Sequence, residues 1–291
     1  MAKLRCIWRI AVENFSEWPT SPRVYVSFIL GALLSFIPAI NLGRFAQALG
    51  EPLNAVEPFI YIGSSLNQFV FIFLGGFLLL SNAPFVSQKT TLTLIRMTRK
   101  TWAMGNMLYM LLSLIVYYLW IMAISAGTVM ANSFWGNTWS DPFYVMTTTD
   151  PMKMSQQYNV YFESLPLLQG MRPLAAVFHT FVLLVLYGFA LSVIMFCLNL
   201  YRGRLMGCAI GLSLHGLSYF IIRNTGIDFP LRWSLIVHAM PASHRLAIQD
   251  RLLPTFDQSY WLFALVISVE MILAIFVMRR FDYRISVGDK E

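Results

Sequence analysis

The residues that could do chemistry in this 291-residue chain are few and mostly isolated. The sequence contains neither the GxxxxGK(S/T) loop that cradles nucleotide phosphates nor the HExxH pair that binds zinc. The segment Gly211-Leu-Ser-Leu-His215 resembles a nucleophile motif, but its fifth residue is His rather than Gly. Ser213 and His215 are two residues apart, so in a helix they point to different faces and cannot pair directly. No catalytic centre, metal site or cofactor is therefore predicted.

The most informative single residue is Glu270, which lies near the middle of a long apolar stretch. A charged side chain at the centre of a membrane costs roughly 2.5–3.5 kcal/mol, so Glu270 should face other helices or a cavity. It could contact a substrate or a proton, or it could form an interhelical hydrogen bond with a partner such as His215 or Asn67. Asn67, Gln68 and His179 belong to the same class of polar residues in apolar stretches that need partners.

The elements that must position these residues are six stretches of 18 or more residues with few or no charges. A helix needs roughly 20 apolar residues to cross the hydrocarbon layer, so each stretch can span a bilayer. Only 12% of the residues are charged and the mean hydropathy is +0.62, whereas roughly a quarter are charged in soluble domains. The sequence therefore predicts an all-α membrane protein with six transmembrane helices. The predicted spans are about 24–43, 59–80, 102–130, 173–201, 205–222 and 260–278.

The distribution of Lys and Arg predicts the orientation of the chain. The segments 1–23, 81–101, 202–204 and 279–291 hold 14 of the 21 basic residues, although the three alternate segments are longer in total. Basic residues are retained on the cytoplasmic side, so both termini should be cytoplasmic and the protein should lie in the cell membrane. The net charge of +7 then reflects orientation and attraction to anionic membrane lipid, and no nucleic-acid partner is expected.

Shorter segments are predicted to lie at the membrane surface. Residues 3–18 place their apolar side chains on one helix face, which predicts an amphipathic interfacial helix within residues 1–22. The apolar segment 233–241 is too short to span and reads as a re-entrant or interfacial helix, broken at Pro241 and continued by 243–253. Between them, 131–172 is rich in aromatic and polar residues, which suits a small ordered outer cap.

The inner loop between the second and third spans is basic and partly apolar. Pro84 should end the preceding helix, and the following residues suggest a short amphipathic helix at the membrane surface. Its basic residues are Lys89, Arg96, Arg99 and Lys100. From these residues alone, the loop could dock on another protein or could equally be a connection that only fixes orientation.

The order of these parts resembles an ABC-2 type transporter permease over nearly the whole chain. The shared parts are the amphipathic N-terminal helix, six spans over residues 23–291, the inner helical loop, the short turn Arg202-Gly203-Arg204 and the broken helix before the last span. The resemblance implies a cytoplasmic coupling helix on which a separate ABC ATPase subunit docks, through Pro84, Lys89, Arg96, Arg99 and Lys100. It also implies a non-catalytic exporter subunit, since the ATP site lies in the partner.

The resemblance further implies a dimer with a second permease subunit, identical or different, because six helices are too few for the usual pathway. Spans two and five would line the interface, where Gly207, Gly211 and Gly216 suit close packing. The same glycines are explained as simply by packing within one chain. The long outer loop 131–172 departs from the short link of the family and suggests a subgroup handling peptides, antibiotics or lipids.

Two other functions are compatible with the sequence. An ion- or proton-coupled carrier or channel would make Glu270 central. The chain has no visible internal repeat, however, which disfavours a carrier built from two inverted halves. A membrane-embedded enzyme or assembly factor is the third hypothesis, and no cluster of catalytic residues supports it.

Overall fold

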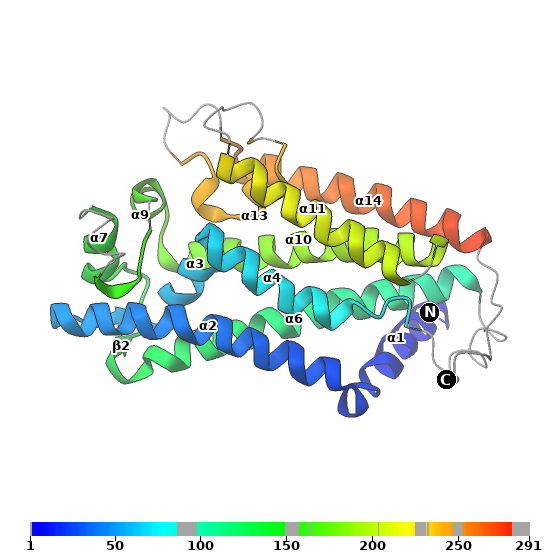
Figure 1. The fold of residues 1–291 in the computed structure, drawn as a ribbon, viewed down its shortest axis with the longest axis horizontal. Helices are drawn as coiled ribbons and strands as arrows, with labels where there is room; N and C mark the ends of the chain where they lie inside the picture. The colour runs from blue at the N-terminus through cyan, green and yellow to red at the C-terminus, as the bar shows by residue number, and fades with distance from the viewer. Residues whose placement is uncertain are drawn as a thin grey trace.

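Long helices run side by side along the longest dimension of the molecule (Figure 1). The computed structural model describes residues 2–85, 98–148, 157–162, 164–202, 204–224, 231, 233–246 and 253–280. Within these residues, five helices are long and apolar enough to cross a membrane. They are α2 (Pro22–Leu49), α6 (Arg99–Val129), α10 (Pro173–Arg202), α11 (Arg204–Asn224) and α14 (Phe256–Arg280). The prediction of an all-α membrane protein is thus confirmed.

The second predicted span differs from the expectation of one continuous helix. The chain forms α3 (Glu57–Ser64) and α4 (Leu66–Leu80), which meet at an angle of 92°. Ser65 joins them in an extended conformation, with φ −91° and ψ 122°. Serine hydroxyl groups compete for backbone hydrogen bonds, which favours a helix boundary at such a position. Together the two helices are long and apolar enough for one bent crossing.

The core is centred on α10 and on the short helix α3. All eight residues of α3 are buried, and α10 is the most buried of the five long helices. A Cβ atom at Gly63 would overlap the side chain of Thr180, so α3 lies against α10 at this glycine. In contrast, α11 and α14 leave most of their apolar surface uncovered by the described chain.

One end of the bundle carries the N-terminal helix, α1 (Ala2–Phe15), followed by the turn η1 (Trp18–Thr20). Helix α1 packs on α6, where Ile10 lies so close to Gly105 that a Cβ atom there would clash. Ile10 and Ala11 are buried in this contact, while Leu4 and Trp8 are exposed. The uncovered apolar residues give α1 a second apolar face, as expected for a helix at a membrane surface.

The opposite end of the bundle carries the short elements (Figure 1). They are β1 (Leu53–Asn54), η2 (Met130–Asn132), β2 (Ser133–Phe134), α7 (Asp141–Thr148), α9 (Leu165–Gly170), α13 (Leu235–Ala239) and η3 (Pro241–Ser243). The two strands pair in parallel. The Glu57 carboxylate accepts hydrogen bonds from the Asn54 N–H at 3.0 Å and from the Ser140 N–H and hydroxyl at 2.7 and 2.6 Å. These bonds fasten the start of α3 to the segment predicted as a cap.

The expected continuation of the broken helix beyond Pro241 is only partly present. Residues 241–243 form η3, and residues 244–246 are not helical, so the predicted helix over 243–253 is wrong there. His244 adopts an extended conformation, with φ −98° and ψ 150°, which ends the helical turn. Residues 247–252 lie outside the described residues.

Candidate functional site

At the α1 end of the bundle, Tyr109 on α6 joins segments that are far apart in sequence. The Trp18 indole N–H donates a hydrogen bond of 2.8 Å to the Tyr109 hydroxyl. The ring of Phe85, which follows α4, meets the Tyr109 ring edge-on with centroids 4.7 Å apart. Phe15 at the end of α1 contacts the same ring at 5.0 Å. Tyr109 therefore connects the N-terminal helix, the chain after α4 and the first half of α6.

Asn199 near the end of α10 forms a second connection at this end. Its amide N–H donates to the Ala83 carbonyl at 2.6 Å, and its amide oxygen accepts from the Gly207 N–H at 2.8 Å. The Cys208 thiol donates to the Ser81 carbonyl at 3.3 Å. Residues 81–85 are thus bonded to α10 and α11 and packed on α6. We call the contacts of Tyr109 and Asn199 the Tyr109–Asn199 junction.

The residues expected to couple to an ATPase lie at or beyond this junction. Pro84 lies between Ala83 and Phe85, which make the two contacts above. Arg99 and Lys100 are exposed in the first turn of α6, and the Arg99 guanidinium donates to the Met278 carbonyl at the end of α14 at 3.5 Å. Lys89 and Arg96 lie outside the described residues. The described members of this set therefore share the α1 end of the bundle (Figure 1).

The predicted polar residues of the spans fall in separate places. Glu270 is 7% exposed, and its Oε2 atom has no hydrogen-bond partner among the described residues. The structure does not join it to His215, whose Nδ1 bonds the Tyr187 hydroxyl at 2.6 Å and whose Nε2 lies 3.3 Å from the Val70 carbonyl. His215 also stacks on Phe73, with ring centroids 4.2 Å apart. His215 is therefore satisfied within the α4, α10 and α11 packing.

The remaining polar residues of this set lie nearer the α13 end. His179 on α10 bonds the Tyr260 hydroxyl on α14 at 2.6 Å. Asn67 and Gln68 follow the bend in the first turn of α4, where Asn67 is exposed and Gln68 is partly buried. Asn67 lines a cavity at the bend between α3 and α4. The three residues thus do not form one pathway with Glu270.

The glycines predicted for dimer packing on α11 have different surroundings. A Cβ atom at Gly207 would overlap Asn199 and the Met195 carbonyl, and one at Gly211 would lie 2.9 Å from Phe77. Both glycines therefore allow close packing within the chain, against α10 and α4. A Cβ atom at Gly216 would meet nothing within 4 Å. Gly216 lies on an exposed face that also carries Leu212 and Leu217.

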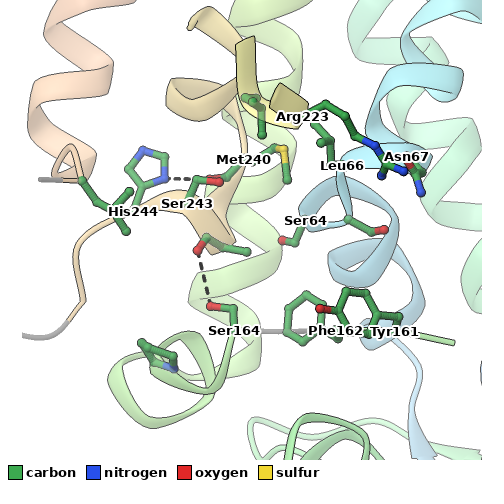
Figure 2. Close-up of a pocket in the computed structure, with 15 residues that line it drawn as sticks. Ser64, Leu66, Asn67, Tyr161, Phe162, Ser164, Arg223, Met240, Ser243 and His244 are labelled. Carbon is green, nitrogen blue, oxygen red and sulfur yellow. Dashed lines mark hydrogen bonds between the residues drawn. The ribbon is translucent and has the colours of Figure 1, made fainter. Parts of the chain in front are cut away.

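A cavity of about 610 Å³ opens at the bend between α3 and α4 (Figure 2). Its walls come from the bend, from the end of α11, from the chain before α9 and from η3. The polar residues that line it are Ser64, Ser65, Asn67, Tyr161, Ser164, Arg223, Ser243 and His244. No Asp or Glu is among the described residues that line it. The cavity is thus polar and carries positive charge.

One wall of the cavity is held by a buried hydrogen-bond chain. The His244 Nδ1 lies 2.9 Å from the Met240 carbonyl, which only a protonated Nδ1 can bond. When the His244 ring is neutral, its Nε2 therefore accepts a hydrogen bond of 2.8 Å from the Ser259 hydroxyl. The Nδ1 atom of His238 lies 2.9 Å from the same hydroxyl. Burial lowers the pKa of His244 to about 4. This chain fastens η3 to the start of α14.

Sequence reasoning missed several of these residues. Asn199 was detectable in principle, because an amide in a long apolar span needs a hydrogen-bond partner. For Ser64 and Arg223 the sequence gives no comparable signal, because hydropathy does not show which residues line a cavity. His238 and His244 are six residues apart, and only the fold brings Ser259 between them.

Comparison with known proteins identified no relative. No protein-family description, no curated protein and no solved structure matches the chain.

Proposed function

We propose that this chain is the transmembrane permease subunit of an ATP-binding cassette exporter. In this proposal the α3–α4 pair makes one bent crossing, so the chain crosses the cell membrane six times, with both termini cytoplasmic. ATP hydrolysis takes place in a separate ATPase subunit, and two permease subunits, identical or different, enclose the translocation pathway. The distribution of basic residues supports this orientation.

The observation that carries the proposal is the Tyr109–Asn199 junction. A partner that pushes on the loop after α4 acts on residues 81–85, which are bonded or packed to α6, α10 and α11. A push on α1 reaches the same tyrosine through Trp18 and Phe15. Packed interiors are stiff, so displacement of either element is transmitted to the long helices rather than absorbed locally.

The surface available to an ATPase includes the exposed ends of α1 and α6. Lys100 is exposed there and forms no hydrogen bond or ion pair within the described residues. Lys89 and Arg96 precede it in sequence and belong to the same basic segment. Such a cluster of basic residues suits an acidic partner surface, which would accelerate association and fix its register.

A charge reversal at the α1 end tests this function. Lys89→Glu, Arg96→Glu and Lys100→Glu combined should abolish co-purification of ATP-hydrolysing activity with the tagged full chain from native membranes. Arg99 is left unchanged because its guanidinium bonds the end of α14. Insertion should be intact, as checked by the amount of chain in the membrane fraction.

The matched control reverses charges at the other end of the bundle. Arg44→Glu with Arg172→Glu changes two exposed arginines away from the junction and should leave the co-purified ATPase activity unchanged. ATPase activity that is absent from the wild-type preparation, or that survives the triple reversal, contradicts the proposal.

A further inference from the structure

We propose that the cavity at the α3–α4 bend binds the phosphate group of an anionic ligand. The inference goes beyond the transport function proposed above and does not depend on it. It is carried by three features that converge on one space, namely a helix N-terminus, a buried hydroxyl without a partner and an arginine (Figure 2).

The first feature is the N-terminus of α4, a helix of 15 residues. The first backbone N–H groups of any helix lack acceptors within it, and the helix dipole places partial positive charge there. Ser65 precedes this helix without capping it through its side chain. Within the described residues, no hydrogen bond uses the N–H groups of residues 66–68. Phosphate groups are frequent ligands of such free N-termini.

The second feature is the hydroxyl of Ser64, one residue before the bend. Ser64 is 4% exposed, and its Oγ atom has no hydrogen-bond partner among the described residues. In Figure 2 its oxygen is turned toward the cavity that Ser64 lines. Buried polar atoms are nearly always paired, and this hydroxyl is free to donate to a group that enters the cavity. A phosphate oxygen supplies such an acceptor.

The third feature is charge. Arg223 in the last turn of α11 and Asn67 in the first turn of α4 both line the cavity, and their side chains lie next to each other in Figure 2. The guanidinium group forms paired hydrogen bonds with phosphate oxygens, and the amide of Asn67 adds a further donor. With no carboxylate in the described lining, nothing there repels an anion.

The size of the cavity indicates that the phosphate belongs to a larger molecule. Its volume of about 610 Å³ lies within the range of roughly 300–1,000 Å³ that is usual for sites of small organic ligands. The cavity also lies beside the last turn of α11, where a membrane-spanning helix reaches the headgroup region. The phosphate can therefore come from a lipid headgroup or from a soluble phosphate ester, and the test must separate these two sources.

The test is isothermal titration calorimetry on the purified full chain in a neutral detergent. The probes are inorganic phosphate, glycerol phosphate and a short-chain phosphatidylglycerol. Tighter binding of phosphatidylglycerol than of glycerol phosphate identifies a lipid headgroup as the source, and equal or tighter binding of glycerol phosphate identifies a soluble ester. Either result supports the proposal, whereas absence of binding by all three probes at millimolar concentration overturns it.

Two variants connect binding to the cavity. Arg223→Gln should raise the dissociation constant about tenfold or more, because a charge-assisted pair is lost. Ser64→Ala should weaken binding severalfold while leaving the melting temperature of the empty protein unchanged or raised, because the deleted hydroxyl has no partner to lose. A residue with a merely structural role would lower the melting temperature instead.

Arg172→Gln is the matched control, since this exposed arginine does not line the cavity. It should bind the probe as the wild type does. Wild-type affinity in both Arg223→Gln and Ser64→Ala would overturn the assignment of the site, even if a probe binds elsewhere.

Discussion

At the scale of single residues, every polar group that is buried in the membrane needs a hydrogen-bond partner. Hydrocarbon offers no water to satisfy it, so a partner must come from another helix. Asn199, His179 and His215 each find one on a neighbouring helix or on the chain next to it. Glu270 Oε2 finds none among the described residues. This carboxyl shares that state with the buried hydroxyl groups of Ser64, Ser113 and Tyr118, and it is the only acidic group among them.

The pH dependence at His244 is a prediction at the residue scale. Its ring is buried and neutral, and burial lowers its pKa from the ordinary 6.5 to about 4. An opened state of the segment would take up a proton below pH 6.5, so the closed state is fully stable above that pH. It loses stability as the pH falls from 6.5 toward 4, by about 3 kcal/mol. Hydrogen exchange of residues 235–243, corrected for the intrinsic rate, measures this loss.

The control for this measurement is His244→Gln, which removes the titrating ring. Its exchange protection should fall clearly less between pH 6.5 and 4 than that of the wild type, because His238 on the same Ser259 hydroxyl is still present. An equal loss of protection in the variant and in the wild type would assign the pH dependence to another group, and the prediction would fail.

At the scale of elements, the second apolar stretch shows how packing fixes the position of a bend within one predicted span. The apolar stretch 59–80 is interrupted by Gly63-Ser64-Ser65 and by Asn67-Gln68, so the bend falls where small and polar residues gather. The helix breaks at Ser65 because α3 turns to bury all eight of its residues against α10 and its neighbours. Helix α4 carries Gly75 and Gly76, where a glycine pair can serve a bend or a close contact. They serve a contact, with Tyr117 of α6.

Gly75→Ala is the prediction at the element scale. A Cβ atom there would overlap the Tyr117 hydroxyl, which donates to the Ile72 carbonyl at 2.9 Å, while the Gly75 carbonyl accepts from Ser27 at 2.6 Å. The variant should therefore loosen the α2–α4–α6 contact and destabilise the protein by about 1–3 kcal/mol. Thermal unfolding in detergent measures this as a lower melting temperature.

Two further variants make the test specific. Tyr117→Phe in the Gly75→Ala background should restore part of the loss, because the overlapping hydroxyl is gone. Gly127→Ala on α6 should be neutral or stabilising, since a Cβ atom there meets nothing within 4 Å. A melting temperature unchanged in Gly75→Ala would contradict the close contact between Gly75 and Tyr117.

At the scale of the whole molecule, the two ends of the bundle differ in their elements and contacts. The α1 end joins the N-terminal helix to the chain after α4 through aromatic and amide contacts. The opposite end carries the short elements and the polar cavity (Figure 1). Coupling to a soluble partner and recognition of a ligand would thus lie on opposite faces of the membrane. This arrangement requires that the chain has one defined orientation in the membrane.

The orientation is tested with single cysteines in a chain whose Cys6, Cys197 and Cys208 are replaced by Ser. A membrane-impermeant maleimide should label Arg172→Cys in intact cells, and should label Lys100→Cys only after permeabilisation. Both side chains are exposed, so access depends on the side of the membrane. The reverse pattern would contradict both the orientation and the docking of an ATPase near Lys100.

The sequence by itself determined the class of protein and the extent of most long helices. Apolar length and the scarcity of charge decide membrane insertion, and both are local properties that can be counted along the chain. Only the tertiary structure decided the bend at Ser65, the partner of His215, the bonds of Asn199 and the cavity beside Ser64. These features depend on which helix faces meet, and hydropathy does not encode the rotation of one helix against another.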